Sequence, residues 1–109
     1  MDIQVRNKKA FVANGGRAHD AALPWLGFVH GAAMDHSAWY LQTRYFAYHG
    51  FNVAAVDLPG HGRSEGPLVS TIGGMADWLA ELLDALGAPS ATIAGHSMGA
   101  LTALDFAAR

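Results

Sequence analysis

The chain has 109 residues, of which 51% are hydrophobic and 15% charged, which predicts one folded domain over residues 1–109 and excludes a disordered chain or a coiled coil. Its net charge of -2 and scattered Lys and Arg residues predict no nucleic-acid or membrane partner, and the lack of cysteine excludes disulfides and thiolate metal sites. No apolar run reaches the roughly 18 residues that a membrane span needs, and no signal-peptide core is present, so we expect a soluble cytoplasmic protein.

The first elements in chain order are predicted to be strands. Residues 2–6 alternate apolar and polar side chains, and residues 9–16 follow with an Asn-Gly-Gly turn signal, so together they predict a short antiparallel pair. The apolar run at residues 23–31 ends in glycine and predicts a strand that is buried on both faces. Residues 35–50 carry apolar side chains at helical spacing and predict a helix.

A second strand and a helix follow. Residues 51–60 predict another buried strand, and the glycine-rich residues 60–67 predict a loop. Ser70 or Thr71 can cap the next helix, which we expect to stop at Gly87. Its apolar residues fall on one stripe at helical spacing: Ile72, Met75, Leu79, Leu82, Leu83 and Leu86.

The last predicted elements are a short strand at residues 90–95 and a helix from residue 96 onward. The order is therefore three strands, helix, strand, helix, strand, helix, and the later strands are continuously apolar. This pattern predicts an α/β fold with a mostly parallel sheet and helices on both faces. No repeat or linker divides the chain, so we expect one unit.

A G-x-S-x-G motif, formed by Gly95, Ser97 and Gly99, lies between the last predicted strand and helix. A serine hydroxyl is a weak nucleophile and must be held where a base and a substrate carbonyl can both reach it. A strained strand-to-helix turn does this, and small residues two positions before and after the serine relieve the crowding. The following helix directs its N–H groups toward developing negative charge, so the Met98 amide is a candidate oxyanion donor. The alternative, a glycine-rich turn without chemistry, is disfavoured by the flanking strand and helix.

The histidines give no metal motif. None of the six has H-x-x-x-H or H-E-x-x-H spacing, so we predict no metal site. We interpret His61, between two glycines, as a loop residue rather than a catalytic base. The remaining isolated histidines are interpreted as surface or helix-end residues: His19, His36 and His49.

The loop after the second buried strand resembles a phosphate cradle only superficially. Glu65 stands where the third glycine of G-x-G-x-x-G would be, so we predict no nucleotide site and no cofactor. Asp57, at the end of that strand, could be catalytic by position. The better interpretation is an aspartate that holds the following loop through backbone hydrogen bonds.

Three ordered motifs resemble those of the α/β-hydrolase superfamily: HGAA at residues 30–33, DLPGHGRSEG at 57–66 and GHSMGA at 95–100. The resemblance covers essentially the whole chain and implies the N-terminal half of that fold, through the nucleophile elbow. It implies that Ser97 is the nucleophile and that an oxyanion hole is formed by the Met98 and Ala32 backbone N–H groups. The residues implied to shape the site are His30, Gly31, Gly95, His96 and Gly99.

The rest of the expected machinery is not found in the sequence. In this fold the chain order is Ser, then Asp or Glu, then His. After Ser97 there is no histidine and one carboxylate, Asp105, which lies two turns along the following helix and is badly placed as the acid. The resemblance implies that the acid, the histidine and the lid lie beyond residue 109. We therefore expect the chain alone to be an inactive portion whose open strand edge pairs with the remainder of the domain or a complementing chain.

For function, the resemblance implies a serine hydrolase that acts on a small carboxylic ester, lactone or thioester through an acyl-enzyme. Ser97 disfavours haloalkane dehalogenases and epoxide hydrolases, which use an aspartate at the elbow, and HGAAM disfavours proline iminopeptidases, which carry HGGPG. Haloperoxidase-like esterases and carbon–carbon bond hydrolases remain open. So do a non-catalytic binding or scaffold protein that kept the elbow, and one half of a split hydrolase.

Overall fold

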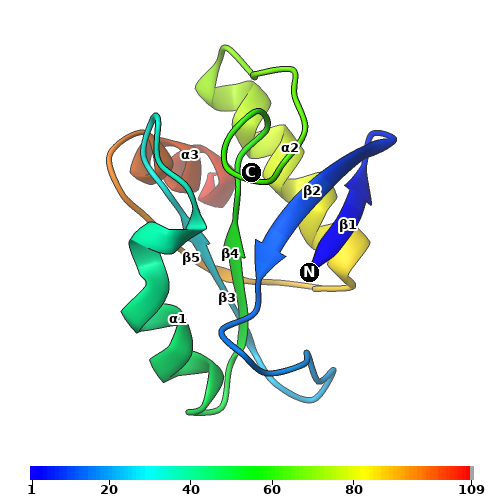
Figure 1. The fold of residues 1–109 in the computed structure, drawn as a ribbon, viewed down its shortest axis with the longest axis vertical. Helices are drawn as coiled ribbons and strands as arrows, with labels where there is room; N and C mark the ends of the chain where they lie inside the picture. Colours follow the sequence, from blue (N-terminus) through cyan, green and yellow to red (C-terminus); the bar gives the residue numbers. More distant parts are fainter. Residues whose placement is uncertain (109) are drawn as a thin grey trace.

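The computed structural model describes residues 1–108, which form one five-stranded sheet with helices on both faces (Figure 1). The elements, in chain order, are β1 (Asp2–Val5), β2 (Lys8–Ala13), β3 (Trp25–Val29), the 3-10 helix η1 (His36–Trp39), α1 (Tyr40–Ala47), β4 (Asn52–Val56), α2 (Ile72–Leu86), β5 (Thr92–Gly95) and α3 (Met98–Ala107). The strand order is β1-β2-β4-β3-β5. Strand β3 pairs in parallel with β4 and β5, whereas β2 pairs antiparallel with β1 and β4. The predicted order of strands and helices is confirmed.

Alternate residues of the central strands pack against different helices. On β4, Val53 and Ala55 belong to the core that includes Ala47 of α1. Their neighbours Ala54 and Val56 belong to the core formed with α2, to which α3 also contributes. Every residue of β3 and β4 is buried, as the continuous apolar runs predict for strands covered on both faces. The α/β fold class is therefore confirmed.

The predicted antiparallel pair at the start of the chain is confirmed, because β1 and β2 form a hairpin. Arg6 and Asn7 form its two-residue loop, and both have positive φ angles, 53° and 61°, as a type I′ turn requires. The Asn-Gly-Gly segment follows the end of β2. There Gly15 has a φ of 73°, and a Cβ atom on it would lie 2.4 Å from the Thr43 carbonyl oxygen.

The helices begin and end where capping chemistry allows. The Thr71 hydroxyl accepts a hydrogen bond from the Gly74 N–H at 2.9 Å, and Gly87 ends α2 with a φ of 80°. The helix predicted at residues 35–50 is shorter and divided, because η1 precedes α1 and α1 ends at Ala47. None of the helices within residues 1–108 has the length and apolarity that a membrane crossing requires.

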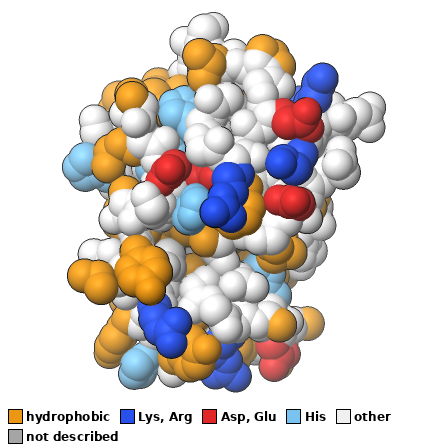
Figure 2. Space-filling view, in the orientation of Figure 1, with side chains coloured by type: hydrophobic (Ala, Val, Ile, Leu, Met, Phe, Trp, Pro, Cys, Tyr) orange, Lys and Arg blue, Asp and Glu red, His pale blue; other side chains and the backbone are white. Residues whose placement is uncertain are grey.

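Strand β5 is the last strand of the sheet and pairs with β3 on one side. Next to it, α3 presents Leu101 and Leu104, which are 55% and 69% exposed. Within residues 1–108, β5 is therefore an edge strand that lies beside exposed leucines of α3. On the face that Figure 2 shows, acidic and basic side chains lie close to one another in the upper half.

Candidate active site

The carboxyl ends of β3 and β5 lie side by side, because Val29 and Gly95 are paired in the parallel register. The His96 N–H donates a hydrogen bond to the Val29 carbonyl at 3.1 Å. A Cβ atom placed on Gly31 would lie 3.3 Å from His96 Nδ1. The structure therefore brings the segment after β3, with its His-Gly pair, against the segment that contains Ser97.

Ser97 occupies a strained backbone conformation at the start of α3, with a φ of 57° and a ψ of -117°. Residues other than glycine rarely adopt positive φ angles, and such strain clusters at functional sites. The turn is closed by the Ala100 N–H, which donates to the Ser97 carbonyl at 2.9 Å. Ser97 is exposed, so this strand-to-helix turn holds its side chain at the surface.

The two glycines of the motif lie where the backbone leaves no room for a side chain. A Cβ atom on Gly95 would be 2.2 Å from the Gly99 carbonyl oxygen, and one on Gly99 would be 2.1 Å from the Val29 oxygen. Real Cβ atoms essentially never come closer than 3.0 Å to another heavy atom. Glycine at both positions therefore lets α3 begin directly against the end of β3.

Two backbone amides near this turn are available as donors. Within residues 1–108, the N–H groups of Ala32 and Met98 donate no hydrogen bond to another backbone or side-chain group. Met98 is the first residue of α3, and N–H groups in the first turn of a helix lack intrahelical acceptors and carry partial positive charge. Ala32 is exposed and follows Gly31 directly. The arrangement can therefore offer N–H donors to a negative oxygen.

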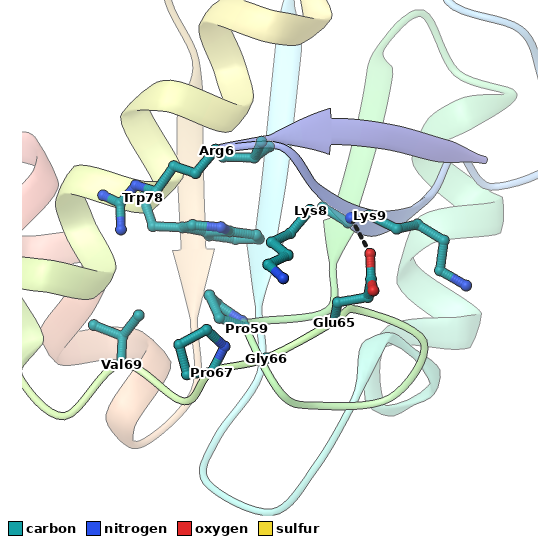
Figure 3. Close-up of a pocket in the computed structure, with 11 residues that line it drawn as sticks. Arg6, Lys8, Lys9, Pro59, Glu65, Gly66, Pro67, Val69 and Trp78 are labelled. Atoms are coloured by element: carbon teal, nitrogen blue, oxygen red, sulfur yellow. Dashed lines mark hydrogen bonds between the residues drawn. The ribbon is translucent and has the colours of Figure 1, made fainter.

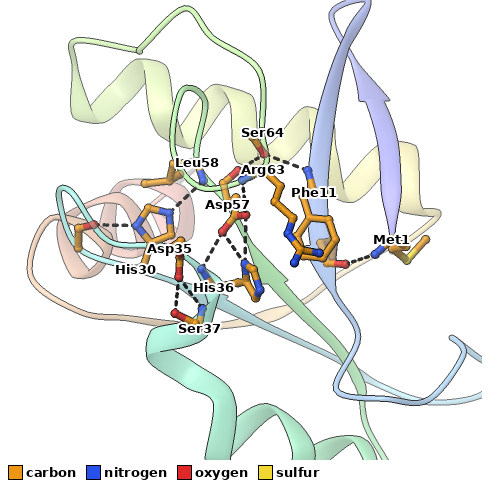
Figure 4. Close-up of polar contacts among 12 residues, drawn as sticks. Met1, Phe11, His30, Asp35, His36, Ser37, Asp57, Leu58, Arg63 and Ser64 are labelled. Carbon is orange, nitrogen blue, oxygen red and sulfur yellow. Dashed lines mark hydrogen bonds and ion pairs between the residues drawn. The ribbon is translucent and has the colours of Figure 1, made fainter.

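His30 is fully buried and uses both ring nitrogens within the protein (Figure 4). Its Nδ1–H donates to the Gly31 carbonyl at 2.7 Å, and its Nε2 accepts from the Leu58 N–H at 3.0 Å. Burial lowers the pKa of His30 below its usual value, since the charged imidazolium is poorly solvated there. The neutral His30 side chain therefore links the ends of β3 and β4 through its hydrogen bonds, and neither ring nitrogen is free to act as a base.

Asp57 anchors two loops at the end of β4. Its buried carboxylate accepts from the Arg63 N–H at 2.9 Å, from the His36 N–H at 2.7 Å and from His36 Nδ1–H at 2.9 Å (Figure 4). The Ser64 hydroxyl also donates to the Asp57 carbonyl oxygen at 2.6 Å. The predicted role of Asp57, holding the following loop through backbone hydrogen bonds, is confirmed.

The sequence interpretation of two histidines is only partly right. His36 does begin η1, but its imidazole forms an ion pair with Asp57 when protonated, and its side chain is 23% exposed. His19 is half-buried, and its Nε2 lies 2.8 Å from the Val53 carbonyl oxygen. No pattern local in the sequence signals these contacts, because they depend on the order of the strands in the sheet and on the path of the chain before β3.

A match to a family model identifies the family of the chain. Residues 24–109 match the model of the alpha/beta hydrolase fold family. The chain belongs to the α/β-hydrolase family. The resemblance to this family that the three sequence motifs indicated is thus confirmed, and the order of strands agrees with the N-terminal half of that fold.

Relatives of this α/β-hydrolase chain include an esterase and other hydrolases. The (E)-2-((N-methylformamido)methylene)succinate hydrolase of Acinetobacter baylyi is 38% identical over 77 residues, which cover 70% of this chain and 29% of the relative. The pimeloyl-[acyl-carrier protein] methyl ester esterase of Nitrosospira multiformis is 36% identical over 89 residues, 79% of this chain and 34% of the relative. The enol-lactonase from Burkholderia xenovorans LB400 superposes with a TM-score of 0.88 and 30% identity, over 100% of this chain and 42% of that one. The chain spans 29% and 34% of these two curated relatives.

The described residues give the Ser97 hydroxyl no histidine partner. Within residues 1–108, no histidine forms a hydrogen bond with the Ser97 hydroxyl. His61 Nδ1 instead lies 3.1 Å from the Pro59 carbonyl oxygen, and Asp105 lies on α3. Within residues 1–108 the strand-to-helix turn and the neighbouring amides lie together, and no histidine hydrogen-bonds to the serine there.

Of two cavities in the described residues, one is lined by a residue next to Ser97 in the chain and the other is not. One, of about 260 Å³, is lined by His96 and Trp39 among others, and the Trp39 Nε1 atom is buried without a hydrogen-bond partner in the described residues. The other, of about 200 Å³, lies between the β1–β2 hairpin, α2 and the loop after β4, with Lys8 and Trp78 in its lining (Figure 3). Because His96 adjoins Ser97 in the chain, the first cavity is the better candidate for a substrate.

One group of side chains has ligand atoms close enough together for a metal ion. The ligand atoms of Asp35, His36 and Asp57 lie within 4.8 Å of one another, and the described residues hold no other such group. The Asp57 oxygens already accept from His36 Nδ1–H and from two backbone N–H groups. These contacts fit a hydrogen-bonded anchor better than a metal centre.

Proposed function

We propose that the protein is a serine hydrolase that cleaves a small carboxylic ester, lactone or thioester through an acyl-enzyme on Ser97. The strained, exposed conformation of Ser97 at a strand-to-helix turn is the observation that supports this proposal most strongly. It presents the hydroxyl at the surface, beside backbone N–H groups that have no other acceptor within residues 1–108.

The reaction proceeds in two steps. Ser97 Oγ loses its proton to a base and attacks the carbonyl carbon, and the tetrahedral oxyanion then expels the alcohol or thiol, which takes up the proton. Water attacks the resulting ester in the same way, releases the carboxylic acid and restores the hydroxyl. The Ala32 and Met98 amides stabilise both oxyanions, and each donor contributes about 3 kcal/mol to the transition state.

The histidine base and the carboxylate that orients it are proposed to come from outside residues 1–109. Supporting this, the curated relatives are about three times longer than the aligned segment, and no histidine follows Ser97 here. A following segment of the same chain or a complementing chain would then complete the sheet at β5. In this arrangement His30, Gly31, Gly95, His96 and Gly99 shape the site around the serine.

The proposed substrate class draws on the relatives. A methyl ester esterase and an enol-lactonase both act at a carboxylic ester carbon, which supports an acyl substrate for this chain. The cavity beside His96 holds about 260 Å³, which suits a small acyl group.

The test is ester and lactone hydrolysis by the protein expressed from its complete reading frame. Ser97→Ala should lower kcat/KM by a factor of about 10³ or more, since the nucleophile is lost. Ser90→Ala, at an exposed serine before β5, is the matched control and should leave the rate unchanged. Undiminished hydrolysis by Ser97→Ala would overturn the assignment of the nucleophile.

A second candidate is a binding protein that retains the elbow without catalysis. The observation in its favour is that no histidine bonds to Ser97 within residues 1–108. The same assay separates the two functions. A folded protein that hydrolyses no ester, lactone or thioester would support the binding protein.

A further inference from the structure

The loop that carries Ala32 is hydrogen-bonded at both of its ends to the two residues that follow β4. At its start, His30 accepts a hydrogen bond from the Leu58 N–H at 3.0 Å and donates to the Gly31 carbonyl at 2.7 Å. At its end, His36 donates twice to the Asp57 carboxylate, through its backbone N–H at 2.7 Å and its ring Nδ1–H at 2.9 Å. Asp57 and Leu58 are consecutive, so both ties meet at one point of the fold (Figure 4).

The chain between these two ties is held in a tight turn. The Met34 N–H donates to the Gly31 carbonyl at 3.3 Å, and Ala33 has a positive φ of 59°. Asp35 then caps η1 by accepting from the Ser37 N–H at 2.8 Å. This short, hydrogen-bonded turn is the path by which a displacement of His36 would reach the Ala32 amide.

The pair is buried well enough to be rigid. Asp57 is fully buried, and a buried carboxylate is strongly stabilised only when its oxygens are hydrogen-bonded. The His36 ring also packs against the Phe11 ring, at 4.8 Å between centroids. The Arg63 guanidinium lies 5.0 Å from the centroid of the Phe11 ring. The Arg63 N–H shares the Asp57 carboxylate, so the loop after β4 is fixed by the same group.

We propose that His36 and Asp57 are positioning residues that hold the Ala32 N–H in place as an oxyanion donor. They act through the backbone and do not touch the substrate. This inference rests on the proposed hydrolase function. An oxyanion donor acts mainly in the transition state, so loosening it should lower kcat more than it raises KM.

The test compares three variants in the protein from the complete reading frame. His36→Ala removes the ring donor and should lower kcat by a factor between about 10 and 10³, because losing one oxyanion donor costs about 10² to 10³. His36→Asn places a side-chain N–H near the former Nδ1 position and should restore most of kcat. His49→Ala, at an exposed histidine after α1, is the matched control and should behave like the parent.

Amide hydrogen exchange on the protein from the complete reading frame gives a second readout that needs no activity. His36→Ala should speed exchange in both anchored loops, residues 31–36 and 60–64, while residues 99–104 of α3 stay as protected as in the parent. Exchange that rises around residue 36 alone would show that the loops are not coupled through Asp57. That result would overturn the inference.

The kinetics distinguish the failure of this inference from the failure of the proposed function. If hydrolysis depends on Ser97 and His36→Ala keeps kcat within twofold of the parent, the positioning role is wrong and the hydrolase stands. A fall in kcat that His36→Asn does not restore also contradicts it, because the donor is then not what matters. If Ser97→Ala is as active as the parent, the hydrolase proposal fails and this inference fails with it.

Discussion

Replacing Ser97 with glycine should stabilise the chain while it removes the side-chain hydroxyl. Ser97 has a φ of 57° and a ψ of -117°, a region that costs a residue with a Cβ atom about 1–3 kcal/mol. Glycine relieves this strain but gives the unfolded chain more freedom, which offsets up to about 1 kcal/mol. The serine is exposed, and no side-chain hydrogen bond of Ser97 holds the turn within residues 1–108. We therefore expect the free energy of unfolding to rise by about 0.5–2 kcal/mol.

Ser97→Ala is the matched control, because alanine keeps the Cβ atom and therefore most of the strain. It should unfold within about 0.5 kcal/mol of the parent. Urea titration followed by tryptophan fluorescence measures both variants, since Trp25 and Trp78 are only 8% and 5% exposed in the folded chain. A Ser97→Gly chain that is no more stable than Ser97→Ala would refute the claim that the turn is strained.

Three further predictions concern stability and protonation. Gly99→Ala should destabilise the chain by at least about 2 kcal/mol in urea titration, because the new Cβ atom would lie 2.1 Å from the Val29 carbonyl oxygen. This loss should exceed the helix preference of alanine over glycine, which is about 1 kcal/mol. A variant as stable as the parent would contradict the close approach of the two backbones. Burial lowers the pKa of His30, so on acidification the unfolded chain binds a proton at this histidine before the folded chain does. The contribution of His30 to the free energy of unfolding is therefore present above about pH 6.5 and is lost as the pH falls through the folded-state pKa. An NMR titration should place the His30 pKa below that of a model peptide, and a value at or above it would be inconsistent with a neutral His30 side chain. Glu81→Ala should change the unfolding free energy by less than about 1 kcal/mol, since its ion pair with Arg6 is 45% and 48% exposed; a double-mutant cycle that gives a larger coupling would disagree.

Patterns local in sequence predicted much of the fold. The stripe along α2, its Thr71 cap and its Gly87 stop depend on residues within one helix, so the sequence suffices to place them. The turn at Ser97 was predicted for the same reason, because the small residues that it needs lie two positions away on either side. The antiparallel pair at the start of the chain was also predicted, whereas the positive φ angles of Arg6 and Asn7 were not, because no glycine signals them.

The contact between His36 and Asp57 could not be predicted from the sequence. The two residues are 21 positions apart, and they meet only because β3 and β4 are neighbours in the sheet. Propensity and periodicity identify strands but do not give their order. The same limit applies to His19, whose contact with Val53 depends on the path of the chain before β3.

Covalent labelling shows whether Ser97 is the nucleophile that we propose. The protein from the complete reading frame would be treated with an alkyl fluorophosphonate, and the modified peptide would be identified by mass spectrometry. We expect one adduct, on Ser97, which persists in Ser90→Ala and is lost in Ser97→Ala. Ester hydrolysis that proceeds with Ser97 unlabelled, or with the adduct on another residue, would overturn the proposed role of Ser97.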